Sequence, residues 1–390
     1  MAKTETKLDV KNALRFALDK VDGNLAPFMD IYPGDTSVHN VYHPRKPRVA
    51  GLADGANVGW TTSFWAGQIW LAFDLTLDAK YRAAGEHHIK SFADRMTRKV
   101  DVDNHDLGFL YTLSCVAPWR LTVNETGKRT ALQAADQLMH RFLDKPGIFQ
   151  AWGTMEDPKQ RGRTIIDSIM NMPLLYWASE MTGNKRYHDA AVRHASQLRD
   201  HIVRPDNTSF HTFYWDADTG APRFGDTAQG AANDSCWSRG QAWGIYGFAL
   251  SYAYTHDATM LHTARCLADY FISRMPADKV AYWDLIYMDG SGEERDSSAA
   301  AIAVCGMQEI IRWMPAGPDR ERYAAAATGI LASLAQNYTS KDAPGSNAIL
   351  LHGVQSKPGK HGIDEASLWG DYYYLEALTR AVRPDWKMYW

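Results

Sequence analysis

At 390 residues the chain is long enough for two average domains or one large ring-shaped domain, and 45% of its residues are hydrophobic, which suffices for a sizeable core. The net charge of −3 offers no basic surface of the kind that binds nucleic acid. No apolar run approaches the roughly 18 uncharged residues that a membrane-spanning helix needs. The sequence therefore favours a protein that binds neither nucleic acid nor a membrane.

Localisation is predicted from the first residues and from the cysteines. The opening residues MAKTETKL lack the apolar core of a signal peptide. Four scattered cysteines show no zinc spacing, which favours free thiols in a reducing compartment (Cys115, Cys236, Cys266 and Cys305). We expect a cytoplasmic protein, or a periplasmic one if a signal peptide has been removed, that is a monomer or a weak homodimer.

Two kinds of helix alternate along the chain. One kind is apolar almost all round, as a buried helix is, and the other is amphipathic. An amphipathic helix is predicted over 7–21, and apolar helices follow at 61–76, 106–122, 167–182, 239–255, 296–314 and from Asp371 onward. Their amphipathic partners end near Arg98 or span 128–143, 185–203, 258–275 and 319–337. Two short segments, 210–214 and 279–284, are expected to form small β-hairpins.

Six such pairs predict a closed ring. The last apolar helix has no following partner except the first helix of the chain, so a single-domain (α/α)6 barrel of six inner and six outer helices over 1–390 is favoured. An open α-solenoid is the alternative. In a closed ring the inner helices start at the same end, so the long loops before them converge on one cavity.

Charged residues stand at these helix starts. Asp167 precedes an apolar run, and taken alone it is typical of a helix cap. The arrangement recurs, however, at Asp106, Arg239, Asp296 and Asp371. Four aspartates and an arginine at one end of a ring indicate a binding site rather than four separate caps.

Aromatic and polar residues fill the loops around these positions. Aromatic walls with a few fixed polar groups suit a carbohydrate, and Arg239 is expected to pair with a carboxylate on the ligand. The alternative for each aromatic residue is a place in the core. The histidines show no metal-binding spacing, so neither a metal nor another cofactor is predicted. The candidate binding residues are Trp60, Phe64, His105, Trp152, His211, Gln229, Trp237, Arg239 and Trp243.

Several sequence segments, in order from about residue 60 to 380, resemble the unsaturated glucuronyl hydrolases, glycoside hydrolase family 88. They are 104–111 (NHDLGFLY), 150–153 (QAWG), 163–168 (RTIIDS), 211–214 (HTFY), 237–248 (WSRGQAWGIYGF), 295–299 (RDSSA) and 369–378 (WGDYYYLEAL). The resemblance implies an (α/α)6 barrel that removes the 4,5-unsaturated uronic acid from lyase-generated oligosaccharides. It implies Asp167 as the general acid and base, Asp106 as the second essential aspartate, and the nine candidate residues as pocket positions.

The chemistry of this substrate sets what Asp167 must do. A vinyl ether conjugated to a carboxylate is hydrated more easily than its acetal is cleaved. A protonated Asp167 would donate to C4 and then accept a proton from the water that adds at C5, unlike the two-carboxylate division of ordinary glycosidases. We expect an ionised Asp106 and an apolar surround to raise the pKa of Asp167.

The loop 351–362 precedes the last inner helix and is expected at the same mouth. Ser356, Lys357 and Lys360 offer the groups that a sulfate ester on the second sugar would need, and a solvated surface loop is the alternative. Three other functions stay open: a sister family acting on unsaturated rhamnogalacturonan, an inverting glycosidase or epimerase, and a non-catalytic sugar-binding barrel.

Overall fold

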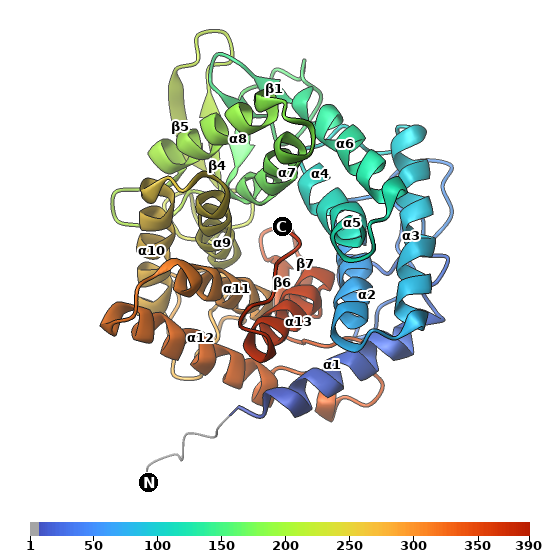
Figure 1. Cartoon of the computed structure of the whole chain (residues 1–390). Coiled ribbons are helices and arrows are strands. Elements are labelled where there is room, and N and C mark those ends of the chain that lie inside the picture. The colour runs from blue at the N-terminus through green and yellow to red at the C-terminus, as the bar shows by residue number, and fades with distance from the viewer. Residues whose placement is uncertain (1–7) are drawn as a thin grey trace.

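The computed structural model describes residues 8–390, so the expected helix start at residue 7 lies outside the described residues. Inner and outer helices alternate around a ring (Figure 1). The inner helices are α2 (Thr62–Thr76), α4 with η1 and α5 (Leu107–Tyr111, Thr112–Val116, Ala117–Thr122), η2 with α7 (Ile166–Asn171, Met172–Thr182), α9 (Ser238–Thr255), α11 (Ser297–Trp313) and α13 (Leu368–Val382). The outer helices are α3 (Ala79–Thr97), α6 (Glu125–Met139), α8 with η3 (Lys185–Gln197, Leu198–Ile202), α10 (Ala258–Ser273), α12 (Pro318–Asn337) and α1 (Val10–Leu25).

The ring closes as the helix pattern predicts. The last inner helix, α13, packs against α2, and α1 packs against both. The inner helices are buried along most of their length, whereas outer helices bury one stripe. The (α/α)6 barrel is therefore confirmed, and the open solenoid is excluded.

Prolines shape two of the inner helices. The segment 106–122 contains a π-helical turn at η1, just before Pro118, which has no N–H to continue the α-helical bonding. The segment from Asp167 begins as the 3-10 helix η2, and the α-helix starts only at Met172, with Pro173 in its first turn. Asp167 is thus inside a 3-10 turn, and its side chain caps no helix.

Short strands form within the loops between the helices. The expected segment 210–214 is confirmed in part, since β4 (Thr212–Trp215) lies between β3 (Arg163–Ile165) and β5 (Pro222–Asp226) in an antiparallel sheet. The segment 279–284 forms only isolated bridges and no strand. Two hairpins were not predicted: β1 with β2 (Phe142–Leu143, Ile148–Phe149) and β6 with β7 (Gly353–Ser356, His361–Glu365).

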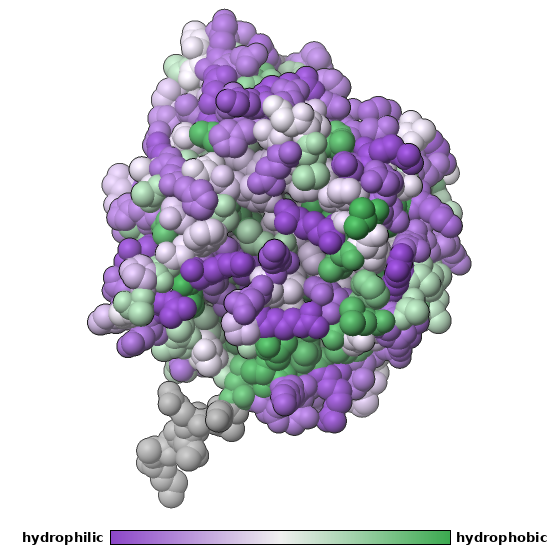
Figure 2. All heavy atoms as spheres, viewed as in Figure 1, coloured by the Kyte–Doolittle hydropathy of each residue, from purple (hydrophilic) through white to green (hydrophobic). Residues whose placement is uncertain are grey.

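The last residues of the described chain fill one end of the ring. Trp386 and Tyr389 bond to Asp74 near the end of α2, and the ring of Trp390 stacks on Tyr373 with centroids 5.9 Å apart. The space-filling view of this face shows the centre filled, with mostly hydrophilic residues around it (Figure 2). The starts of the inner helices lie at the opposite end, where the candidate site is found.

Within residues 8–390, no helix is long and apolar enough to cross a membrane.

Candidate active site

One cavity gathers residues from the starts of the inner helices. It brings together both predicted catalytic aspartates and seven of the other predicted residues, and it adds two that were not predicted, Ile165 and Gln355. Its walls are formed by Trp60, His105, Asp106, Trp152, Ile165, Asp167, Gln229, Trp237, Arg239, Trp243 and Gln355. The indole rings surround a small polar interior, which is the composition of a carbohydrate site.

Asp106 and Asp167 reach the cavity from adjoining segments. Asp106 stands directly before α4, where its backbone N–H donates to Asn104 Oδ1 at 2.9 Å, and Asp167 lies in η2. The two segments touch at Gly108, because a Cβ atom there would lie far inside van der Waals distance of Asn171 Cα. This glycine lets the two acid-bearing segments approach closely.

Burial raises the pKa of both carboxyl groups. Burial, followed by the charge of Asp167, raises the pKa of Asp106 to about 8. Burial raises the pKa of Asp167 to about 7, although Arg239 lowers it. Burial thus raises the pKa of Asp167 as expected, and the repulsion between the two carboxylates is shared by the pair. A proton is available to the pair at neutral pH.

One carboxyl oxygen of Asp167 is left unpaired by the described part of the protein. Its Oδ1 atom is buried and has no hydrogen-bond partner within the described part of the chain. Buried carboxyl oxygens are normally paired. An unpaired one in a cavity wall is therefore suited to exchange a proton with a bound substrate.

Arg239 already has a charge partner in the protein. Its Nη1 lies 2.7 Å from Asp296 Oδ2 and also donates to the carbonyl of Val354, while Nη2 donates to the carbonyl of Gln355 at 2.6 Å. The guanidinium also lies over Trp237, 4.4 Å from the ring centroid. Arg239 therefore holds the β6 strand in place as well as lining the cavity, a structural role that the sequence did not indicate.

The remaining two aspartates at helix starts serve the scaffold. Asp296 caps α11 by accepting from the N–H groups of Ser298 and Ala299. Asp371 lies inside α13 and accepts from the backbone N–H groups of Ile349 and Leu350 at 3.1 and 2.7 Å. The prediction that all five charged residues converge on the cavity is therefore wrong for these two.

The two predicted histidines have different places. His105 lines the cavity, and its Nε2 lies 3.3 Å from Asp106 Oδ1. Burial holds the pKa of His105 well below its usual range, so its ring is neutral. His211 lies behind the wall against Trp237, with ring centroids 4.6 Å apart, and its Nδ1 accepts from the N–H groups of Ala228 and Gln229. His211 thus fixes the loop that carries Gln229.

Four other predicted residues do not line the cavity. Phe64 is buried under Trp60, with ring centroids 5.7 Å apart. Ser356 is the last residue of β6, where alternate residues face opposite sides, and Lys357 and Lys360 lie in the turn between β6 and β7. Gln355 takes the cavity side. Lys357 instead forms ion pairs with Glu294 and with Glu293, the latter at 3.3 Å.

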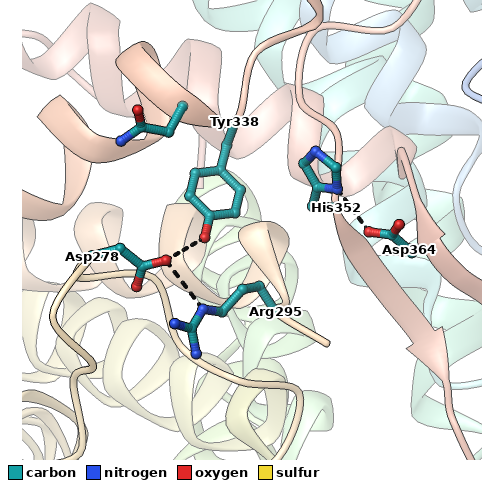
Figure 3. Close-up of a pocket in the computed structure, with 6 residues that line it drawn as sticks. Asp278, Arg295, Tyr338, His352 and Asp364 are labelled. Carbon is teal, nitrogen blue, oxygen red and sulfur yellow. Dashed lines mark hydrogen bonds and ion pairs between the residues drawn. The ribbon is translucent and has the colours of Figure 1, made fainter. Parts of the chain in front are cut away.

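A second polar cavity is lined in part by Asp364 of this hairpin and shares no lining residue with the candidate site (Figure 3). In it Tyr338 donates to Asp278 Oδ2 at 2.6 Å and Arg295 Nε lies 3.1 Å from the same atom, while His352 pairs with Asp364 at 2.7 Å. Among residues 8–390, no three His, Cys, Asp or Glu side chains are placed to hold a metal ion.

The chain is similar to a known protein family over most of its length. Residues 37–381 match the model of Glycosyl Hydrolase Family 88. The chain is 43% identical over 383 residues to the unsaturated chondroitin disaccharide hydrolase of Streptococcus pyogenes serotype M1, a match that covers 98% of this chain and 93% of that protein. The crystal structure of unsaturated glucuronyl hydrolase from Streptococcus agalactiae has a TM-score of 0.92 at 40% identity, covering 100% of this chain and 94% of that one. An aspartate-to-asparagine mutant of the latter, complexed with dGlcA-GalNAc6S, has a TM-score of 0.85 at 39% identity, covering 100% and 95%.

Proposed function

The chain belongs to glycosyl hydrolase family 88, and from that premise we propose that it removes the 4,5-unsaturated glucuronic acid from the non-reducing end of lyase-generated glycosaminoglycan oligosaccharides. The observation that carries the proposal is the pair of buried carboxyl groups, Asp106 and Asp167, in one aromatic-walled cavity. The ring of helices forms one catalytic domain that needs no cofactor. A non-catalytic sugar-binding barrel has no use for two buried carboxyls with raised pKa values.

The reaction begins with proton transfer to the double bond. Asp167 donates its proton to C4, and positive charge spreads over C5 and the ring oxygen. When the pair holds its single proton on Asp167, the Asp106 carboxylate stabilises this charge. Because burial raises the pKa of Asp167 to about 7, the group holds a proton to donate near neutral pH.

Water then completes the hydration. The Asp167 carboxylate accepts a proton from a water molecule whose oxygen bonds to C5. The resulting hemiketal opens to a ketone at C5 and a hemiacetal at C1, which releases the remaining sugar. Asp167 ends the cycle protonated, so one residue serves as acid and then as base.

The substrate is held by the other wall residues. Trp60, Trp152, Trp237 and Trp243 offer flat faces to the sugar rings, and Gln229 and Gln355 offer amide groups to its polar edge. Arg239 supplies the positive charge nearest the uronate carboxylate. In this proposal its guanidinium serves both Asp296 and the substrate.

Sulfate on the second sugar is recognised by Lys360 at the tip of the β6–β7 hairpin rather than by Lys357. Support comes from the exposure of Lys360 and from the two carboxylates that neutralise Lys357. The sulfated disaccharide bound to the Streptococcus agalactiae mutant is consistent with this preference.

The proposal includes a cytoplasmic location and a monomeric or weakly dimeric state. The location is supported by the four cysteines, all within the described residues, which are free thiols. Free thiols persist in reducing compartments.

The test is the loss of ultraviolet absorbance of the conjugated double bond when the protein meets unsaturated chondroitin disaccharides. We expect steady loss with stoichiometric release of the amino sugar. An unsaturated rhamnogalacturonan disaccharide serves as the comparison substrate. Faster turnover of that substrate would move the proposal to the sister family, and no turnover of either would refute it.

A further inference from the structure

Asn171 stands at the junction of the two acid-bearing segments. It is the last residue of η2, four positions after Asp167, and it is completely buried. Its side-chain Oδ1 accepts a hydrogen bond from the backbone N–H of Phe109 at 2.8 Å, in the helix that Asp106 precedes. One end of this amide therefore ties the Asp167 segment to the Asp106 segment.

The other end of the amide faces Asp106. The Nδ2 group is buried and has no partner within ordinary hydrogen-bond geometry among residues 8–390. It nevertheless lies close enough to the Asp106 carboxyl to lower the pKa of that group. An amide NH2 can only donate, so it favours the ionised carboxylate over the protonated form. Catalytic hydrogen bonds that are long in an empty site commonly shorten in the substrate complex.

The other charges around the pair act in both directions. Asp167 and Asp101 raise the pKa of Asp106, Arg141 lowers it, and His105 beside it is neutral. Arg239 lowers the pKa of Asp167. Arg239 thus favours the ionised form of Asp167, whereas hydration of the substrate needs the proton on Asp167.

We propose that Asn171 is a positioning residue that keeps the shared proton on Asp167, by donating an Nδ2–H hydrogen bond to the Asp106 carboxylate in the substrate complex. The proposal rests on the proposed function, since it assigns the acid role to Asp167. The role is distinct from the bond to Phe109, which only aligns the two segments.

Two substitutions separate the two ends of the amide. Asn171→Ala removes both interactions, whereas Asn171→Asp keeps an acceptor for Phe109 N–H but replaces the donor beside Asp106 with a carboxyl. We expect each to reduce kcat on unsaturated chondroitin disaccharide by about 10- to 100-fold, the range of a hydrogen bond to a charged group, with KM nearly unchanged. The basic limb of the Asn171→Ala profile moves to higher pH, because Asp106 then holds its proton more tightly.

Stability provides the contrast. Asn171→Asp should melt closer to wild type than Asn171→Ala and yet turn over no faster. If Asn171 were merely structural, rates would follow melting temperatures and the pH profile would not move. Near-normal kcat in Asn171→Asp would overturn the proposal.

A measurement on the wild-type protein keeps the proposal falsifiable if neither variant folds. The side-chain amide resonances of Asn171, in 15N-labelled protein with a saturated disaccharide bound in place of the substrate, should shift as the Asp106–Asp167 pair titrates. Resonances that stay fixed across that titration contradict the proposal. Since the saturated disaccharide has no double bond to hydrate, this result is independent of whether the protein hydrolyses the substrate.

Discussion

Asp106→Asn should stabilise the protein while it abolishes turnover. Burial and the charge of Asp167 raise the pKa of Asp106 from its ordinary value of 3.8 to about 8. Between these two values the folded protein retains a proton that the unfolded chain has lost, so this group lowers the free energy of unfolding as the pH rises. The cost is at most about 1.4 kcal/mol per pH unit. An asparagine at this position cannot titrate and escapes the cost.

The assay is thermal unfolding of wild type and Asp106→Asn at pH values from 5 to 8. For a chain of this length about 1 kcal/mol corresponds to roughly 1 °C in Tm, so we expect the Tm advantage of the variant to grow by a few degrees across the range. Asp200→Asn, at an exposed site on η3, is the matched control. A Tm difference that does not change with pH would refute the raised pKa of Asp106.

Three further predictions follow from other contacts. Arg239→Ala should lower the free energy of unfolding by about 3–5 kcal/mol, because Asp296 is left buried without its partner. It should also raise KM more than it lowers kcat. Unchanged KM and stability would show that Arg239 neither binds the substrate nor supports the fold. Lys360→Ala should lower the ratio of the rates on sulfated and unsulfated unsaturated chondroitin disaccharides. Lys357→Ala should leave this ratio unchanged, because Glu293 and Glu294 already neutralise Lys357. The reverse result would show that Lys357 reaches the sulfate. Gly108→Ala should cost about 1–3 kcal/mol through overpacking against Asn171 and should lower kcat; a normal Tm and rate would mean that the two segments can separate without harm.

The ring could be predicted from the sequence because the same pair of helix types is repeated along the chain. Each inner helix is apolar all round and each outer helix has one apolar face, and this contrast survives changes in loop length. The boundaries were less predictable where proline intervenes, as at Pro118 and Pro173. The small sheet could be predicted only in part, because β3 is far from β4 in the chain and shows no strong pattern alone.

Cavity residues could be predicted where they stand at the start of an inner helix. They could not be predicted where a contact with a distant segment sets the position of the side chain. Asp106, Asp167 and the tryptophans were identified from their positions and from the resemblance. The ion pair of Arg239 with Asp296 joins two helices, and neither sequence segment alone indicates it. Gln355 was missed because the register of the β6 strand, not its composition, turns that residue toward the cavity. Asn171 did leave a signal, as the one amide in an apolar run.

The central claim is that Asp167 is the proton donor and acceptor of the reaction. The most direct measurement is turnover of an unsaturated chondroitin disaccharide by Asp167→Asn, followed by loss of ultraviolet absorbance, with binding measured by calorimetry on the same sample and Asp200→Asn as the control. We predict a rate at least about 10²- to 10⁴-fold below wild type, with binding and melting temperature preserved. A variant that binds the disaccharide and turns it over at a near-normal rate would contradict the account.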